Sequence, residues 1–371
     1  MAMRRAIGLM SGTSMDGVDA AFVETDGEGS VHAGPGLSAP YPAALRRDLQ
    51  ALLGAREASA ASEAAAAAVT EAHIAAVEAL LARIGRAAEA IDVVGFHGQT
   101  IFHQPPQAGR PGWTWQLGDG QAMADRLGIP VVFDFRSADM AAGGQGAPLA
   151  PVYHRALAAA IDAFPAAFLN VGGVSNLTFL ADVDSPPIGF DTGPGNAPID
   201  DLVHRRTGAG FDENGRLARA GRVDERALAA MLEHPYFGAP YPKSLDRNAF
   251  DVGSVEALST EDAAATLVAF AAEAVARGAA LLPDRPRAWY VTGGGRRNPA
   301  IMAALEARLG APAALVEAIG TDGDLLEAQA FGYMAVRRLR DLPISFPETT
   351  GCAAPTVGGR LAAPSAPRNS W

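Results

Sequence analysis

One local pattern occurs twice in this sequence and restricts its fold more than any other feature. A short apolar segment, a glycine-rich polar turn and a second apolar segment lie at residues 6–24 and again at residues 167–181. Two apolar runs joined by such a turn are typical of a two-stranded hairpin. Further strands and helices are expected after each copy. The sequence therefore predicts two similar α/β halves whose phosphate-binding turns face each other across a cleft.

Helices and strands alternate around the two hairpins. Leucines recur at helical spacing in the Ala-rich segment 43–90, and the predicted helix at 324–340 has one apolar side. Helices are also expected at 148–161 and, after the capping sequence Ser-Thr-Glu-Asp, from 259 to about 277. Further strands are predicted at 91–96, 129–135, 188–191 and 289–292.

A glycine-rich segment at 142–148 predicts the boundary between the two halves. The first domain would cover residues 1–142 and the second domain residues 143–339. The C-terminal segment 340–371 begins with a stretch rich in Pro, Gly and Thr, and we expect it to pack back on the first domain.

Composition excludes several classes of protein. The chain has 371 residues, of which 49% are hydrophobic and 19% charged, and this globular balance argues against disorder. The net charge of −11 makes nucleic acid a poor expectation as a partner. The one lysine, Lys243, follows a proline, which excludes a Walker A loop because that loop needs lysine after glycine. The one cysteine, Cys352, excludes an internal disulfide and a cysteine metal cluster.

Membrane and targeting signals are also weak in this sequence. No uncharged apolar stretch reaches the ~18 residues that predict a membrane span. The apolar run near Met1 is too short for a signal sequence. The default expectation is a soluble cytoplasmic protein without a membrane partner.

The two glycine-rich turns could bind phosphate groups. In residues 8–17 (GLMSGTSMDG), several backbone N–H groups and hydroxyls could wrap a phosphate, and Asp16 could hold Mg²⁺ through water. An ordinary polar hairpin turn would need similar residues, so this turn alone does not decide the matter. Residues 170–176 (NVGGVSN) have the same chemistry, and the pair of turns favours a nucleotide site.

Two further motifs follow predicted strands. Asp191 lies at a strand end before a glycine-rich turn, where a carboxylate could act as general base toward a hydroxyl or water. It could equally be a turn aspartate that binds its own backbone, and the local sequence leaves both open. The glycines at 293–295 could let a flat adenine lie on the backbone.

Four polar positions could contact a sugar. His97 and Gln99 follow a strand and could bind sugar hydroxyls. Arg136 could pair with a substrate carboxylate or form an internal ion pair with a nearby aspartate such as Asp139. Glu327 lies in a predicted helix, and by itself it favours the interpretation as a solvated helix charge.

Taken in chain order, these blocks resemble the anhydro-N-acetylmuramic acid kinase family. The order and number of the blocks make the resemblance specific over residues 8 to about 335. It implies the two-domain fold shared by actin, hexokinase and the Hsp70 ATPase domain, with the active site in the interdomain cleft. The blocks that carry the resemblance are GLMSGTSMDGVD at 8–19, FHGQTIFHQP at 96–105, DFR at 134–136, AGGQGAPL at 142–149, NVGGVSN at 170–176, GFDTGPGN at 189–196, VTGGG at 291–295 and DGDLLE at 322–327.

The resemblance implies one particular reaction. An ATP-dependent kinase would convert 1,6-anhydro-N-acetylmuramic acid, ATP and water into N-acetylmuramic acid 6-phosphate and ADP during peptidoglycan recycling. Asp191 matches the catalytic base, which would take a proton from the water that attacks C1. The resemblance also implies Mg²⁺ and a homodimer. Another sugar kinase on the same fold and a nucleotide-dependent switch are the alternatives.

The resemblance further implies two sets of binding residues. The ATP site would contain Gly12, Thr13, Ser14, Met15, Asp16, Gly17, Val18, Asp19, Asn170, Gly172, Gly173, Gly293, Gly294 and Gly295. The sugar would contact His97, Gln99, Arg136, Asp139, Thr192, Gly195, Asn196 and Glu327. Asp16 is the candidate metal residue.

Overall fold

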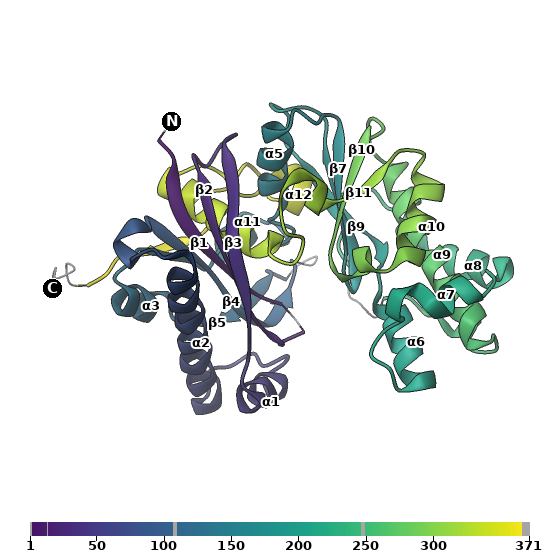
Figure 1. Cartoon of the computed structure of the whole chain (residues 1–371), viewed down its shortest axis with the longest axis horizontal. Helices are drawn as coiled ribbons and strands as arrows, with labels where there is room; N and C mark the ends of the chain where they lie inside the picture. The colour runs from purple at the N-terminus through teal and green to yellow at the C-terminus, as the bar shows by residue number, and fades with distance from the viewer. Residues whose placement is uncertain (1, 13, 107–109, 246–248, 366–371) are drawn as a thin grey trace. The chain divides into compact units, whose positions relative to one another are not determined.

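A computed structural model describes residues 2–12, 14–106, 110–245 and 249–365. The chain divides into two compact units (Figure 1). Unit 1 consists of Met1–Ala160 and Leu325–Trp371, and unit 2 consists of Ile161–Asp324. Each unit has its own β-sheet.

The sheet of unit 1 follows the order β12-β6-β4-β1-β2-β3, with β5 paired to β4. The first three strands form an antiparallel meander, β4 and β6 run parallel to β1, and the short tail strand β12 closes the other edge. The strands are β1 (Arg4–Ser11), β2 (Gly17–Thr25), β3 (Val31–Pro40), β4 (Val93–Gln104), β5 (Trp113–Leu117), β6 (Val131–Phe133) and β12 (Arg360–Ala362).

The sheet of unit 2 repeats this plan in the order β11-β10-β7-β8-β9. Here too an antiparallel meander is followed by two strands parallel to its first strand. The five strands match β6-β4-β1-β2-β3 one for one. They are β7 (Ala166–Val171), β8 (Val174–Leu180), β9 (Ile188–Pro194), β10 (Ala288–Thr292) and β11 (Ala313–Leu315). The duplication expected from the two hairpins is confirmed, and both units are α/β units built on a mixed sheet.

Seven α-helices and one 3₁₀ helix accompany the sheet among the described residues of unit 1. They are α1 (Ala43–Ala51), α2 (Ala60–Ile84), η1 (Ala88–Ala90), α3 (Gly120–Leu127), α4 (Ser137–Ala141), α5 (Pro151–Ala160), α11 (Leu326–Leu339) and α12 (Pro347–Thr350). Helix α11 packs closely on the sheet because two glycines leave room for its backbone. A Cβ at Gly8 would lie 1.7 Å from the carbonyl oxygen of Ala328, and one at Gly95 would lie 2.2 Å from that of Phe331.

This packing of α11 moves the unit boundaries from those expected. Helix α5 and helix α11 both belong to unit 1, whereas the sequence placed residues 143–339 together in a second domain. Tyr153 of α5 donates its hydroxyl hydrogen to Gln329 of α11 at 3.1 Å, so the two helices are also bonded to each other. These contacts join residues far apart in the chain, and a local composition shift does not reveal them.

Helix α2 is long and apolar enough to cross a membrane by length and composition alone. Half of the most apolar 18-residue stretch of this helix is buried inside unit 1. Val69, Ile74, Val77 and Leu80 lie in the core beside the sheet. A core helix of this kind passes the same composition test as a membrane span.

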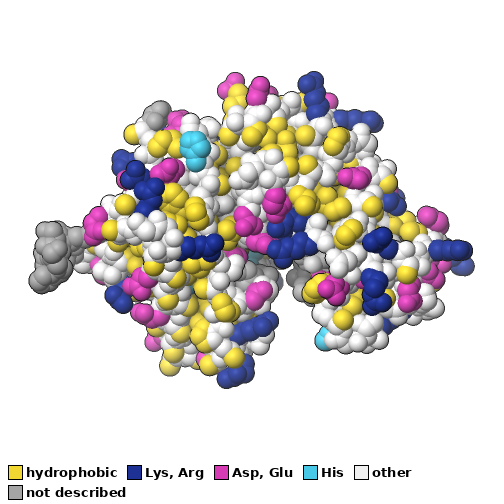
Figure 2. All heavy atoms as spheres, in the orientation of Figure 1, with side chains coloured by type: hydrophobic (Ala, Val, Ile, Leu, Met, Phe, Trp, Pro, Cys, Tyr) yellow, Lys and Arg dark blue, Asp and Glu magenta, His cyan; other side chains and the backbone are white. Residues whose placement is uncertain are grey.

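Basic side chains are dispersed among acidic and apolar ones on the face shown in Figure 2.

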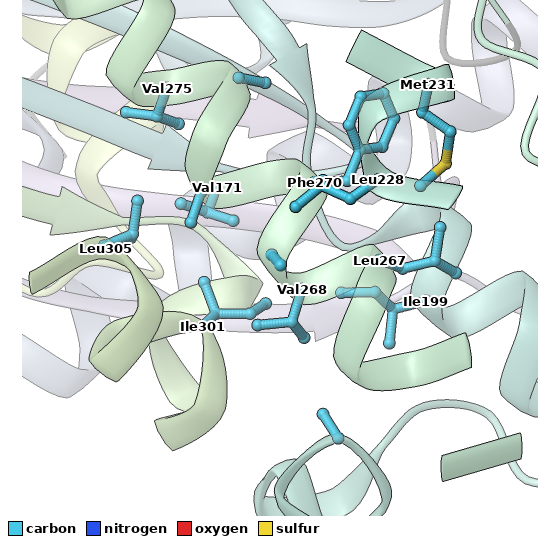
Figure 3. Packing of buried hydrophobic residues seen from close by; sticks show 14 of the residues in the cluster. Val171, Ile199, Leu228, Met231, Leu267, Val268, Phe270, Val275, Ile301 and Leu305 are labelled. Atoms are coloured by element: carbon cyan, nitrogen blue, oxygen red, sulfur yellow. The ribbon is translucent and has the colours of Figure 1, made fainter. Parts of the chain in front are cut away.

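Unit 2 has its core around one long helix, α9 (Thr260–Ala279), which begins after the N-cap Ser259 as the sequence predicts. Leu267, Val268 and Phe270 of this helix pack beside Ile199 and Ile301 from the helices around it (Figure 3). The other described helices are α6 (Ala197–Thr207), η2 (Glu213–Gly215), α7 (Arg216–Ala220), α8 (Glu225–Leu232), η3 (Pro235–Gly238), η4 (Gly253–Val255), η5 (Gly294–Arg297), α10 (Pro299–Leu309) and η6 (Val316–Ile319).

Candidate active site

The turn between β1 and β2 is held at its start by one buried glutamine of β4, and Ser11 joins its start to its end. Ser11 Oγ lies 2.6 Å from Gln99 Oε1 and 2.9 Å from the carbonyl oxygen of Gly17. Gln99 Nε2 donates to the carbonyl oxygen of Gly12 at 3.1 Å. Gln99 is 0% exposed. Its side chain therefore braces the turn from inside unit 1, which differs from the direct sugar contact expected from the sequence.

The same turn presents its polar residues outward. Ser14 and Asp16 are exposed and bonded to each other, whereas Met15 is 1% exposed. The φ angle of Met15 is +55°, a conformation uncommon for residues other than glycine, and its side chain is buried in the core of unit 1. The buried methionine holds the turn to the sheet beneath it. Thr13 lies outside the described residues.

The flanks of the turn complete its geometry. Gly17 has no room for a side chain, because a Cβ there would lie 2.2 Å from the carbonyl oxygen of Ala39. Val18 is buried, and Asp19 Oδ1 accepts the hydroxyl hydrogen of Ser38. Of the ATP residues expected in this segment, the exposed and half-buried ones are Gly12, Ser14, Asp16, Gly17 and Asp19.

His97, Arg136 and Glu327 belong to one cluster in unit 1. Arg136 approaches the His97 Nε2 with its Nε at 3.1 Å and its Nη2 at 2.9 Å, and donates from Nη1 to the carbonyl oxygen of Gly146 at 2.6 Å. Because Nε2 accepts these bonds, His97 is neutral with its proton on Nδ1, which lies 2.8 Å from the carbonyl oxygen of Gly98. Desolvation and the charge of Arg136 hold the pKa of His97 well below its usual value.

The charges around Arg136 come from two acidic residues. Desolvation lowers the pKa of the Arg136 guanidinium, and the negative charges of Glu327 and Asp139 oppose that shift. Glu327 is exposed to solvent, but desolvation by the surrounding protein raises its pKa, with Arg136 acting in the opposite direction. A guanidinium has five N–H donors, so the three bonds to His97 and Gly146 leave donors for an acidic ligand.

Asp139 lies in the interior rather than at a surface open to a sugar. It is 0% exposed, and its two carboxylate oxygens accept hydrogen bonds from Thr350 Oγ1 at 2.6 Å and the Gly146 N–H at 2.7 Å. Asp139 is thus a bracing residue of unit 1, in contrast to the direct contact expected.

A cavity of about 240 Å³ lies next to His97 in unit 1. Its walls come from the first half of β4, from β5 and from the end of β6. Trp115, Gln116, Asp134 and Arg360 supply an aromatic ring, an amide and two charges to this cavity. The size and the mixture of polar groups and aromatic rings suit a single sugar ring.

In unit 2, the second glycine-rich turn is joined to the turn after β9. The N–H of Gly195 donates to the carbonyl oxygen of Gly173 at 3.0 Å, and that of Asn196 donates to Gly172 at 2.8 Å. A Cβ at Gly195 would lie 2.0 Å from the carbonyl oxygen of Gly172, so only glycine allows this approach. The expected sugar positions Gly195 and Asn196 thus lie beside the expected phosphate turn.

The glycine triplet after β10 meets the same turn. A Cβ at Gly293, where φ is +79°, would lie 2.2 Å from Asn170 Oδ1, and one at Gly295 would lie 2.3 Å from a methyl carbon of Val171. Asn170, Gly172 and the triplet 293–295 are therefore neighbours at one end of the sheet of unit 2. The sequence predicted a common ATP site for these segments, and the structure brings them together.

A cavity of about 260 Å³ opens beside this glycine triplet. Gly294 and Gly295 form part of its floor, and Asn196 and Asn298 add amide groups. The ring of Phe211, which is 61% exposed, lines the same cavity. Sequence reasoning missed Phe211, because a lone aromatic in the segment before η2 has no local signal.

Asp191 lies on β9 at a β-bulge of unit 2. Asn176 pairs with Asp191 and Ser175 pairs with Gly193, so Thr192 is an extra residue on β9. Thr192 is 1% exposed and donates its hydroxyl hydrogen to the carbonyl oxygen of Ser175 at 3.1 Å. Thr192 therefore holds the bulge from the interior, in place of the sugar contact expected.

The carboxylate of Asp191 is half-buried and, among the described residues, accepts one backbone N–H. Its Oδ2 accepts the N–H of Leu245 at 2.8 Å. Desolvation raises the pKa of Asp191 to about 6, and this hydrogen bond opposes part of the shift. A carboxyl group with a pKa near 6 is ionised at neutral pH and is a stronger base than an ordinary aspartate.

The segment that contacts Asp191 includes the only lysine of the chain. The N–H of Asp191 donates to the carbonyl oxygen of Lys243 at 3.0 Å. Lys243 Nζ donates to the carbonyl oxygen of Tyr236 at 3.0 Å and lies 4.5 Å from the centre of the Tyr236 ring. In the sequence, the place of Lys243 after a proline only excludes a Walker A loop. Its position shows a second role, in holding residues 236–245 together beside β9.

Comparison with known proteins decides the family. Residues 4–363 match the family model described as anhydro-N-acetylmuramic acid kinase. The chain belongs to the anhydro-N-acetylmuramic acid kinase family. A relative from Rhodospirillum rubrum with that name is 52% identical over 356 residues, which cover 95% of this chain and 93% of the relative. A relative of the same name from Phenylobacterium zucineum is 51% identical over 372 residues, covering 97% and 100%.

Solved structures of other proteins resemble this member of the family more distantly. Component A of (R)-2-hydroxyglutaryl-CoA dehydratase from Acidaminococcus fermentans has 10% identity and a TM-score of 0.49, covering 91% of this chain and 99% of its own. Xylulose kinase from Lactobacillus acidophilus has 11% identity and a TM-score of 0.47, covering 98% and 94%. The assignment to the anhydro-N-acetylmuramic acid kinase family rests on the sequence matches alone.

Proposed function

We propose that this chain is an ATP-dependent kinase that opens 1,6-anhydro-N-acetylmuramic acid with water and phosphorylates O6. The products are N-acetylmuramic acid 6-phosphate and ADP, and the reaction returns a peptidoglycan sugar to metabolism. The observation that carries this proposal is the Asp191 carboxylate, whose pKa is raised to about 6, in a chain that matches the family over residues 4–363.

Asp191 is the proposed general base. It takes a proton from water as the water oxygen bonds to C1 of the sugar. The bond between C1 and O6 breaks, and its electron pair stays on O6. O6 then bonds to the γ-phosphorus of ATP, and the bond from that phosphorus to the leaving oxygen of ADP breaks. The N–H of Leu245 keeps Oδ2 in place, and Oδ1 is the oxygen that we propose accepts the proton.

The two glycine-rich turns are the proposed phosphate-binding elements. In unit 1 the outward-facing Ser14 and the backbone around it offer donors to phosphate oxygens. In unit 2 the adenosine would occupy the cavity of about 260 Å³, with the adenine between the Gly294 backbone and the Phe211 ring. The location of the whole active site in an interdomain cleft stays a prediction.

The residues at the first turn fit a magnesium ion held with ATP. Among the described residues no group of three or more His, Cys, Asp or Glu side chains could hold a metal. Mg²⁺ needs no such group, because it commonly binds one or two carboxylates together with waters and substrate phosphates. Asp16 is exposed at the turn and supplies one carboxylate. The ion would neutralise charge on the phosphates.

Arg136 is the proposed ligand of the lactyl carboxylate of the sugar. Guanidinium groups bind carboxylates with two parallel hydrogen bonds, and Arg136 has donors left for this. His97 orients Arg136, and Glu327, whose charge acts on Arg136, is the proposed acceptor of a sugar hydroxyl. For Gln99, Asp139 and Thr192 we propose bracing roles in place of direct sugar contact.

Mass spectrometry of the product made in ¹⁸O-labelled water tests the mechanism. The wild-type protein with Mg-ATP and the anhydro sugar should give a 6-phosphate that carries the label at the C1 hydroxyl. Asp191→Asn should abolish product formation, whereas the exposed control Asp182→Asn should retain it. Phosphorylation of a different sugar without label would reject the anhydro-sugar reaction in favour of an ordinary sugar kinase.

The cellular context is part of the same proposal. By resemblance to the family we propose a homodimer in the cytoplasm, with ATP and a small sugar as its ligands. Sedimentation equilibrium with the purified chain would measure the dimer, and fractionation of cells would locate the protein.

A further inference from the structure

The C-terminal helix α12 is bonded to the glycine-rich segment 142–148 of unit 1. The N–H of Gln145 donates to the carbonyl oxygen of Thr350 at 2.7 Å, and the N–H of Ala353 donates to that of Ala142 at 2.9 Å. These backbone bonds join residues more than 200 positions apart. The segment 142–148 is thus held by the tail of the chain.

The buried carboxylate of Asp139 is the centre of this contact. Thr350 Oγ1 donates to one carboxylate oxygen at 2.6 Å, and the Gly146 N–H donates to the other at 2.7 Å. A buried charge of this kind is costly unless its oxygens have donors, so both bonds are needed. A Cβ at Gly144 would lie 2.3 Å from Asp139 Oδ2, so glycine at this position lets the segment close around the carboxylate.

The same segment holds the guanidinium of Arg136. The carbonyl oxygen of Gly146 accepts a hydrogen bond from Arg136 Nη1 at 2.6 Å, and the N–H of Gly146 donates to Asp139. One glycine therefore links the Thr350–Asp139 pair to Arg136 through its two backbone groups. A shift of Gly146 would change the direction in which the free donors of Arg136 point.

We propose that Thr350 is a positioning residue for Arg136, acting through Asp139 and Gly146, and that it sets the affinity for the carboxylate of the acidic sugar. The inference rests on the proposed function of Arg136. Paired hydrogen bonds to a carboxylate require alignment of both partners, so a small rotation of the guanidinium weakens both bonds. Among the residues that the structure describes, Thr350 bonds to Asp139 and to segment 142–148, not to the glycine-rich turn between β1 and β2. The affinity for ATP is therefore independent of Thr350.

Steady-state kinetics of three variants test the role of Thr350. Thr350→Val removes the hydroxyl and keeps the shape. It should raise the KM for the anhydro sugar about tenfold, because misalignment of Arg136 weakens its hydrogen bonds to the sugar carboxylate. The KM for ATP should stay unchanged. Thr350→Ser retains a hydroxyl and should restore the sugar KM. Thr350→Ala also removes the hydroxyl and should show the same selective rise in the sugar KM. It replaces Thr350→Val if the valine variant does not fold.

Thr349→Val is the matched control from the same helix. Thr349 is 2% exposed, and its hydroxyl bonds to backbone groups of Phe346 rather than to Asp139. The control should therefore leave the sugar KM unchanged. Equal increases in Thr349→Val and Thr350→Val, or a parallel rise in the ATP KM, would show a general folding role and overturn the proposal.

Hydrogen exchange separates the contact from the proposed function. Thr350→Val should speed amide exchange in residues 142–148 relative to Thr349→Val, whatever the substrate of the enzyme. Unchanged exchange would overturn the role of Thr350 in holding this segment. Faster exchange with an unchanged sugar KM would overturn the link to Arg136. A wild-type protein that does not convert the anhydro sugar would instead reject the proposed function.

Discussion

Tyr236 donates its phenolic hydrogen to the backbone oxygen of Asp191 at 2.6 Å. The same tyrosine accepts the Lys243 ammonium at its own carbonyl oxygen. Asp191 is thus held from three directions, by Tyr236, by Lys243 and by the Leu245 N–H. A base that must meet a water molecule at one defined point requires such support, because misplacement by about 1 Å can cost a hundredfold in rate.

Replacement of Tyr236 by phenylalanine should lower kcat. The lost hydrogen bond to the Asp191 backbone allows the carboxylate to move, and we expect a decrease of about tenfold with little change in the KM for ATP. Tyr241→Phe is the control, because its ring stacks on Phe190 in the same segment. Steady-state kinetics at saturating ATP measure both variants. Equal losses in the two variants would contradict a specific role for Tyr236.

The pH dependence of activity should follow the ionisation of Asp191. Desolvation raises its pKa to about 6, and only the ionised carboxylate can take a proton from water. The value of kcat/KM for the sugar should therefore be constant at neutral pH and fall about tenfold per unit below pH 6. A profile that stays flat from pH 7 down to pH 5 would exclude Asp191 as the base.

Asp191→Asn should make the protein more stable at neutral pH while removing activity. The folded-state pKa of about 6 lies above the ordinary aspartate value of 3.8, so the folded state keeps its proton to higher pH than the unfolded state. As pH rises from 3.8 to 6, the free energy of unfolding of the wild type therefore falls by up to about 3 kcal/mol relative to the variant. Above pH 6 the difference stays constant. Melting temperatures of both proteins at pH 4 and pH 8 should diverge only at the higher pH.

Gln99→Leu should weaken ATP binding more than sugar binding. The substitution removes the bonds to Ser11 and Gly12 that brace the first turn, and we expect the KM for ATP to rise about tenfold. Gln104→Leu, at the end of the same strand, is the control. A rise confined to the sugar KM would instead favour the direct sugar contact predicted from the sequence.

Buried histidines should make the protein labile to acid. Desolvation lowers the pKa of His73 to about 4, below the ordinary 6.5, and its Nδ1 already bonds the carbonyl oxygen of Val69. The unfolded state therefore binds a proton first as pH falls from 6.5 to 4, and the free energy of unfolding decreases over that window. Urea midpoints between pH 7.5 and 4.5 measure the slope. His73→Gln should flatten it, and an unchanged slope would contradict this origin.

Local patterns in the sequence predicted the fold more completely than the site. The hairpins at 6–24 and 167–181 and the capped helix after Ser259 depend on neighbouring residues, so the sequence was sufficient to predict them. The roles of Gln99 and Asp139 were expected to be direct contacts, because polar residues beside a strand end resemble ligands. Their burial depends on partners elsewhere in the chain, which no local pattern reveals.

The sequence by itself determined the family and the duplicated α/β plan, because each depends on a motif or on neighbouring residues. Asp191, expected at a strand end, lies inside β9 at the bulge. Only the tertiary structure decided which polar residues face outward and which brace the site from within. The bond from Thr350 to Asp139 spans 211 positions, and the cavity beside Phe211 is closed by segments from three parts of unit 2. Such contacts arise when packing brings distant segments together, and packing depends on the whole chain.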